Sequence, residues 1–134
     1  MKHSNSIVAW TSLVALLLAA GAATAQDVAK VSPETHRLLL ENERVRVFDV
    51  RAKPGEKVGM HSHPAGILYY LSDATLKMTY PDGKTEVRDV KSGTAVWSEG
   101  LTHAVENIGT TELHEVHTEL KGPSRGAVRK VREL

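Results

Sequence analysis

The chain has 134 residues, with 17 lysines and arginines against 16 aspartates and glutamates, and it contains no cysteine. This near-neutral balance argues against a nucleic acid or an anionic membrane surface as partner. The lack of cysteine excludes disulfides, thiolate metal ligands and thiolate catalysis. We therefore expect an apolar core, a metal ion or oligomerisation to stabilise the fold.

Residues 1–25 have the composition of a secretory signal peptide. Lys2 makes the start basic, residues 7–20 are almost entirely apolar, and Ala23-Thr24-Ala25 provides a small-residue cleavage site. A membrane anchor is the weaker alternative, because a spanning helix needs about 20 apolar residues. We predict cleavage after Ala25 and a periplasmic or secreted protein that no longer contacts the membrane. The mature chain, from Gln26, suits one small domain.

The mature sequence consists of short apolar runs between turn signals, with no long apolar period of 3.6 residues. This pattern is typical of an all-β barrel or sandwich of roughly six to nine antiparallel strands. We expect an extended N-terminal arm and a first strand within residues 26–40, the barrel in residues 41–121, and a basic tail in residues 122–134. A phase slip near Phe48 predicts a bulge. Strands are predicted at 36–40, 45–50, 58–63, 66–72, 75–80, 85–90, 94–97, 102–108 and 112–120.

Two histidines stand two residues apart in the sequence His61-Ser62-His63. Side chains alternate along a strand, so both rings point to the same face and can converge on a metal ion. A third histidine, His103, follows 40 residues after His63. Two solvated polar residues are the alternative for such a pair. The flanking prolines, Pro54 and Pro64, and the distal histidine favour a metal site.

These histidines lie in stretches that resemble the two sequence motifs of the cupin family. The first motif is G-x5-HxH-x3/4-E-x6-G, and the second is G-x5-PxG-x2-H-x3-N, whose first glycine is here offset by one residue. The resemblance covers roughly residues 41–120 and implies a double-stranded β-helix, the jelly-roll barrel of that family. The matching residues are Gly55, His61 and His63 in the first motif, and Gly93, Gly100, His103 and Asn107 in the second.

The chain departs from these motifs at three places. The alignment that we prefer puts Ile67 where the family has a glutamate ligand. Ala74 replaces a glycine, and Ser98 or Glu99 replaces a proline. The usual metal carboxylate is therefore absent from the predicted ligand set, and the site carries one more positive charge, which favours an anionic ligand.

Alternation along the strand after Pro64 predicts that Ile67 and Tyr69 point inward with the histidines, and that Leu68 and Tyr70 point outward. Tyr69 is then a candidate catalytic residue, which could supply a proton or hold a bound oxygen. The alternative is an inward tyrosine that only packs, with its hydroxyl satisfied.

Several further polar residues have two interpretations. His114 and His117 fall on opposite faces of the last strand, so one of them could be an additional inward group, although packing would also explain them. Glu106 is expected to be solvated, and Asn107 is expected to fix a turn or a strand end. Trp97 is expected to pack or to line a pocket.

Three histidines with an open coordination position are typical of a catalytic metal site. The expected cofactor is one divalent metal ion (Fe, Zn, Mn, Ni or Cu) bound by His61, His63 and His103, with affinity falling through the ordinary histidine pKa of about 6.5. The resemblance implies an Fe(II) dioxygenase acting on a small molecule. The alternatives are a metal-dependent isomerase or lyase, and a non-catalytic module that binds a metal or a small ligand. We also expect a homodimer, with Leu68 and Tyr70 among the contacts.

Overall fold

The computed structural model describes residues 26–122, which form one short helix and nine strands. The elements are α1 (Val28–Val31), β1 (His36–Glu41), β2 (Val45–Ala52), β3 (Lys57–His63), β4 (Gly66–Tyr70), β5 (Ala74–Thr79), β6 (Thr85–Val90), β7 (Ala95–Ser98), β8 (Leu101–Asn107) and β9 (Leu113–Leu120). These strands pair in an antiparallel sense and build two sheets, β1-β2-β9-β4-β7 and β3-β8-β5-β6. The predicted all-β double-sheet barrel is confirmed.

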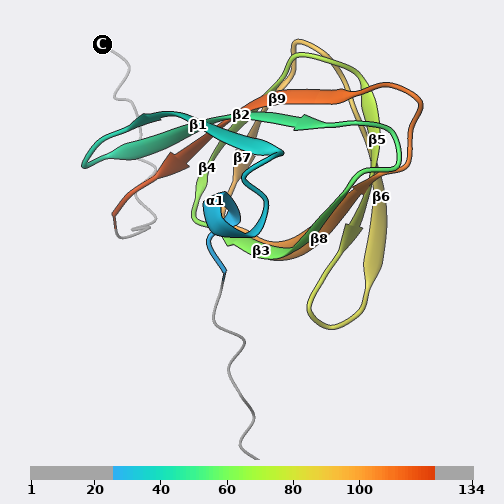
Figure 1. Ribbon diagram of the computed structural model, residues 1–134, viewed down its shortest axis with the longest axis horizontal. Coiled ribbons are helices and arrows are strands. Elements are labelled where there is room, and N and C mark those ends of the chain that lie inside the picture. Colours follow the sequence, from blue (N-terminus) through green and yellow to red (C-terminus); the bar gives the residue numbers. More distant parts are fainter. Residues whose placement is uncertain (1–25, 123–134) are drawn as a thin grey trace, which may run out of the picture.

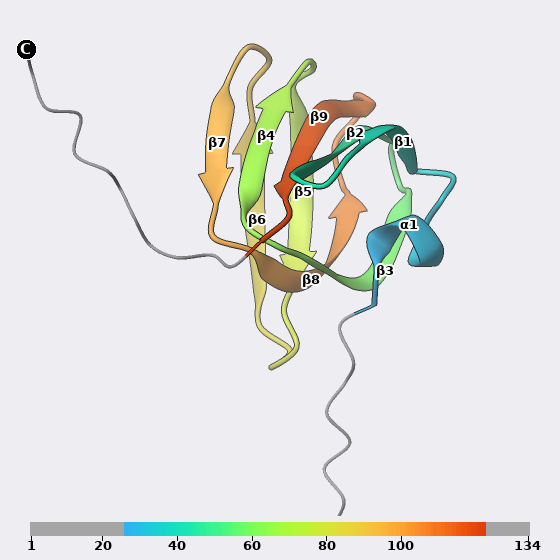
Figure 2. The same cartoon turned by 90° about the vertical axis from the view of Figure 1, so that its left-hand side faces the viewer.

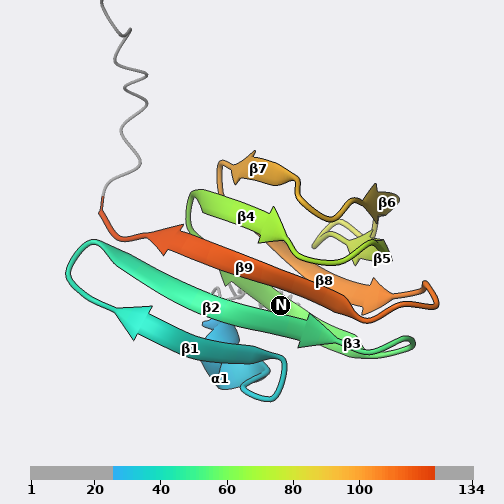
Figure 3. The ribbon, with the colours of Figure 1, turned by 90° about the horizontal axis from the view of Figure 1, so that it is seen from above.

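The two sheets face each other and curl into a barrel (Figures 1 and 2). Figure 3 shows the strands of the larger sheet side by side in one layer, with β9 at its centre. Helix α1 contacts β1 of one sheet and β3 of the other (Figure 1). It therefore covers the side of the barrel where the first strands of the two sheets diverge.

Alternating side chains decide what the barrel encloses. In β5 every second residue is apolar and buried. In β9 the buried alternate residues are Leu113, Glu115, His117 and Glu119. The central strand of the larger sheet thus turns three polar side chains toward the interior. Burial of polar groups is costly unless they are hydrogen-bonded or bind something, so this interior does more than pack.

The N-terminal segment differs from the predicted extended arm, because Val28–Val31 form one helical turn. The carboxylate of Asp27 accepts a hydrogen bond from the Ala29 backbone N–H and caps the turn. Val28 is completely buried in a small cluster with Phe48. A single turn is too short to show a helical period, so the sequence pattern could not reveal it.

The predicted bulge near Phe48 lies instead in the partner strand. β2 pairs with β9 without interruption, whereas the register of β1 against β2 shifts between Leu38 and Leu40. β2 carries apolar side chains on both faces. The break in the alternation of apolar residues near Phe48 therefore comes from this two-sided pattern, and not from an extra residue in β2.

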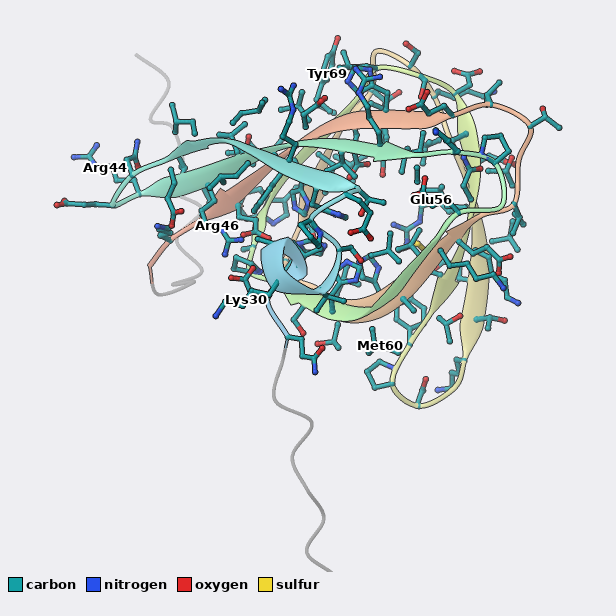
Figure 4. The ribbon with its side chains drawn as sticks, viewed as in Figure 1. Lys30, Arg44, Arg46, Glu56, Met60 and Tyr69 are labelled. Carbon is teal, nitrogen blue, oxygen red and sulfur yellow. The ribbon has the colours of Figure 1, made fainter. Side chains whose placement is uncertain are left out.

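The inward face of β4 is the opposite of the predicted one. Ile67 and Tyr69 are 44% and 43% exposed, whereas Leu68 packs against the core and Tyr70 is buried. Figure 4 shows the Tyr69 side chain projecting away from the barrel. The prediction carried the alternation of β3 into β4, but these strands belong to different sheets. The chain crosses from one sheet to the other in the turn between them. Counting alternate residues across that turn therefore does not tell which side chains of β4 point inward.

The predicted signal peptide and the basic tail from residue 123 onward lie outside the described residues. Within residues 26–122, no helix is long and apolar enough to cross a membrane.

Candidate metal centre

The three predicted ligands lie together on the inner face of the smaller sheet. His61 and His63 are on β3, and His103 on β8 is the direct cross-strand partner of His61. The ring centroid of His61 lies 4.6 Å from that of His63 and 4.7 Å from that of His103. All three side chains are buried.

The larger sheet adds two further histidines to this group. His117 on β9 places its ring centroid 4.4 Å from that of His63. His36 on β1 lies 5.7 Å from His61 and 5.9 Å from His63 by the same measure. Five buried imidazoles, which we call the histidine cluster (His36, His61, His63, His103 and His117), therefore meet inside the barrel.

Hydrogen bonds fix the tautomers of three of these rings. The Nδ1 atom of His61 lies 2.7 Å from the carbonyl oxygen of Gly59, which can only accept, so Nδ1 carries the proton. The Nδ1 of His63 lies 2.7 Å from a carboxylate oxygen of Glu119 and donates to it. In a neutral imidazole the other nitrogen, Nε2, then carries the lone pair that a metal requires.

His36 is held in the same way by its neighbour. The Thr35 hydroxyl donates to the Ser32 carbonyl oxygen, and its oxygen lies 2.8 Å from His36 Nδ1. Because a hydroxyl has one proton, Nδ1 of His36 is the donor of this second bond and Nε2 keeps its lone pair.

Other nitrogens in the cluster are buried without a hydrogen-bond partner. Among residues 26–122 these are both ring nitrogens of His103 and Nε2 of His117. Unsatisfied buried polar atoms are rare in native proteins and need an explanation. A bound metal ion would satisfy them, so the histidine cluster is consistent with a metal site.

Two triads in the described residues offer ligand atoms within 4.8 Å of one another: His36–His61–His63 and His63–His117–Glu119. The predicted triad that ends at His103 is not one of them. His61 and His63 thus hold their predicted place, and three residues from outside the predicted set, His36, His117 and Glu119, offer ligand atoms beside them.

Burial also sets the charge state of the cluster. Desolvation lowers the pKa of His36, His63 and His117 to about 3 and that of His103 to about 2. It lowers the pKa of His61 as well. The neutral imidazole is the form that binds metals, so the fold holds these side chains ready for that role.

Glu119 is the anionic neighbour of the cluster. Burial raises its pKa, and the Arg46 guanidinium, whose Nε lies 3.5 Å from Glu119 Oε2, opposes that rise. Arg46 also donates to Asp27 at the start of α1. Both carboxylate oxygens of Glu119 therefore have protein partners, which leaves the carboxylate to orient His63.

A cavity of about 310 Å³ opens beside the histidines. Away from them it is lined by Leu68 and Tyr70 of β4, Glu115 of β9 and Arg88 of β6. Burial raises the pKa of Glu115 to about 7 and, together with the charge of Glu115, that of Tyr70 to about 12. The cavity thus joins a nitrogen-rich end to an end with a carboxyl and a phenol.

Tyr69 takes no part in this interior, so its predicted inward position beside the histidines is wrong. Trp97 borders the cavity, as one interpretation predicted, but it is 52% exposed and is the cross-strand partner of the outward-facing Ile67. His114 lies outside the barrel and hydrogen-bonds to Asp49. Glu106 pairs with Lys57.

Sequence reasoning missed His36 and Glu119, and it left His117 unresolved. The sequence did contain a signal for His117 and Glu119. Together with Glu115 they occupy alternate positions of one predicted strand, so all three share a face. No local pattern marks His36, which reaches the cluster only because β1 joins the larger sheet beside β2.

Three solved structures illustrate what this chain is similar to. A cupin domain from Bordetella pertussis has 28% sequence identity, with 65% of this chain and 92% of that domain covered and a TM-score of 0.60. An RmlC-like cupin from Methanocaldococcus jannaschii has 18% identity, covers 64% and 78%, and has a TM-score of 0.53. A double-stranded β-helix protein from Klebsiella pneumoniae has 22% identity, covers 66% and 76%, and has a TM-score of 0.52. The last two show the fold alone. No protein-family model and no curated protein matches the sequence.

The fold and the site together define a small double-stranded β-helix with a buried histidine cluster beside a cavity. This is the fold of the cupin superfamily, whose sequence motifs the chain also resembles.

Proposed function

We propose that this protein binds one divalent metal ion through the histidine cluster and that the bound metal contacts a small molecule in the adjoining cavity. The observation that carries this proposal is the set of buried, unpartnered nitrogens on His103 and His117. They lie beside His61 and His63, whose Nδ1 protons are already engaged. An interior that only packed would not leave such atoms unsatisfied.

The donor chemistry limits the metal. Imidazole nitrogens suit Fe, Zn, Cu and Ni better than the harder cations, which prefer oxygen ligands. A bound ion of this kind supplies a Lewis acid and, for a redox metal, a site for oxygen chemistry. The chain itself supplies the neutral imidazoles and an enclosed cavity.

Two reaction classes fit this cavity. An oxygenase with Fe(II) remains the first candidate, on the basis of the resemblance. The buried carboxyl of Glu115 favours a second candidate, a metal-dependent isomerase or lyase, because a carboxyl facing the cavity beside Tyr70 can accept or return a substrate proton. A binding module without turnover is the third candidate.

Metal analysis tests the shared part of these candidates. We expect the purified protein to hold close to one equivalent of metal after dialysis, and His61→Ala or His63→Ala to lose it. His114→Ala, on the outer side of β9, is the control and should keep it. Absence of metal from the parent protein after reconstitution with Fe(II), Zn, Mn, Ni and Cu would disprove the proposal.

Turnover then separates the three candidates. Consumption of O₂ with a small-molecule panel supports the oxygenase. Exchange of a substrate C–H proton for deuterium without O₂ uptake, abolished in Glu115→Gln, supports the isomerase or lyase. Tight ligand binding without either reaction supports the binding module.

We also propose export with cleavage after Ala25. The intact mass of protein from the periplasmic or secreted fraction should match a chain that begins at Gln26. A chain that retains Met1 in that fraction would contradict the proposal.

A further inference from the structure

Leu68 and His117 are direct cross-strand partners on β4 and β9, and both side chains line the cavity. Four residues separate His63 from Leu68, which is a spacing that the first cupin motif allows for its glutamate. Because β4 turns Leu68 inward and Ile67 outward, Leu68 rather than Ile67 occupies the carboxylate position. An apolar side chain there provides no ligand.

His117 has the chemistry that Leu68 lacks. Its ring centroid is 4.4 Å from that of His63, closer than the 4.6 Å between His61 and His63. The side chain is buried, and its Nε2 has no hydrogen-bond partner among the described residues. A nitrogen in that state, next to a histidine whose own Nε2 is free, is poised to share a metal ion with it.

We propose that His117, from the strand beside β4, supplies the fourth metal ligand with His61, His63 and His103, in place of the carboxylate absent at Leu68. This inference rests on the proposed metal site and specifies its coordination. It predicts a site with nitrogen ligands only, so the ligands themselves contribute no charge to cancel that of a divalent ion. An anionic small molecule is then the class of ligand that fits the cavity.

Two other residues near His63 are weaker candidates for the fourth position. Glu119 already accepts the Nδ1 proton of His63 and lies beside Arg46, so its oxygens are occupied. His36 keeps a free Nε2 and offers a ligand atom within 4.8 Å of His61 and His63, but its ring centroid lies 5.9 Å from that of His63, against 4.4 Å for His117. The experiment therefore includes a His36→Ala variant as a competing assignment.

The test uses Co²⁺ as probe with the metal-free protein. Affinity is measured by competition with a chelating dye, and the visible absorption of bound Co²⁺ reports the coordination number. His117→Leu should weaken binding by more than the roughly 10–100-fold that accompanies loss of a ligand's hydrogen-bond partner, and should change the absorption. His114→Leu on the outer face of the same strand should change neither. His117→Gln keeps a polar side chain and gives the same loss should the leucine variant fail to fold.

The double variant Leu68→Glu/His117→Leu tests the exchange of positions directly. Recovery of affinity with a new absorption spectrum supports the inference. The inference is overturned if the double variant binds Co²⁺ as weakly as His117→Leu does. It is also overturned if His117→Leu keeps the affinity and the absorption of the parent protein. Loss of Co²⁺ binding in His36→Ala with retention in His117→Leu assigns the position to His36 and also overturns it. Failure of the parent protein to bind any metal would instead disprove the proposed function.

Discussion

His63 and Glu119 come from opposite sheets of the barrel and are joined by a buried hydrogen bond of 2.7 Å between Nδ1 and Oε1. The bond engages the Nδ1 proton of His63 and leaves Nε2 with its lone pair. Arg46, beside the second carboxylate oxygen, supplies the compensating positive charge. The orientation of a proposed metal ligand on one sheet thus depends on a carboxylate carried by the other.

Replacement of this carboxylate should weaken metal binding without abolishing it. Glu119→Gln keeps the shape and an accepting oxygen but loses the charge that makes His63 a stronger donor to metal. We expect metal affinity to fall by roughly 10–100-fold, measured by chelator competition. Glu106→Gln, at a partly exposed ion pair with Lys57, is the control. Equal affinities in the two variants would contradict the role of Glu119.

The metal-free protein should lose stability steeply in mild acid. The folded-state pKa of His36, His63 and His117 is about 3, whereas an unfolded histidine titrates near 6.5. Between these values the unfolded chain binds more protons, so stability falls as the pH falls. Each such histidine costs about 1.4 kcal/mol per pH unit in that window. A small domain should therefore unfold within about two units below pH 6.5. Urea midpoints measured from pH 7.5 to 4.5 check this, and constant midpoints would contradict it.

The same pKa values change the expected pH dependence of metal binding. The sequence suggested that affinity falls through pH 6.5, but in the folded protein protons compete with the metal only near the lowered pKa values. Affinity measured while the protein stays folded should therefore vary little between pH 7 and 6. Titrations with Co²⁺ and a simultaneous circular-dichroism check would test this. A tenfold loss over that unit in folded protein would show that the cluster titrates normally.

Gly66 should tolerate no side chain. A Cβ atom there would lie 2.3 Å from the carbonyl oxygen of Thr118, in the central strand β9. Gly66→Ala should destabilise the protein by roughly 1–3 kcal/mol or more, because neither backbone can move without breaking the sheet. Gly59→Ala is the matched control, since its Cβ would meet only Val31 at 3.7 Å. Equal thermal midpoints for the two variants would refute this account.

The outer face of the larger sheet is the surface through which we propose that the chain forms a homodimer. Leu68 and Tyr70, the contacts first predicted, point inward instead. Cross-strand pairs place one mainly apolar row over all five strands, and exposed apolar rows of this kind mark association surfaces. The row is Leu40, Val47, Thr118, Ile67 and Trp97.

Ile67→Arg should convert the dimer to a monomer, because it introduces a charge at the middle of this row. Val87→Arg is the control, since Val87 is 61% exposed on the other sheet. Sedimentation at micromolar concentration measures both. A parent protein that sediments as a monomer would disprove the dimer.

Much of this protein could be predicted from local sequence patterns. Each predicted strand is present, because alternation and turn residues act over a few neighbouring positions. The same alternation correctly put His61 and His63 on one face. Asn107 fixes a turn as expected, donating to the carbonyl oxygens of Ala52 and Thr111.

The tertiary structure alone decided which residues complete the site. His36, His117 and Glu119 reach the cluster from the other sheet, and their distance from His63 along the chain carries no information about that contact. The inward face of β4 likewise depends on the change of sheet after His63, which a count of alternating residues cannot register. Strand formation is governed by neighbours in sequence, whereas the composition of a barrel interior is governed by which strands pair and which faces they turn toward each other.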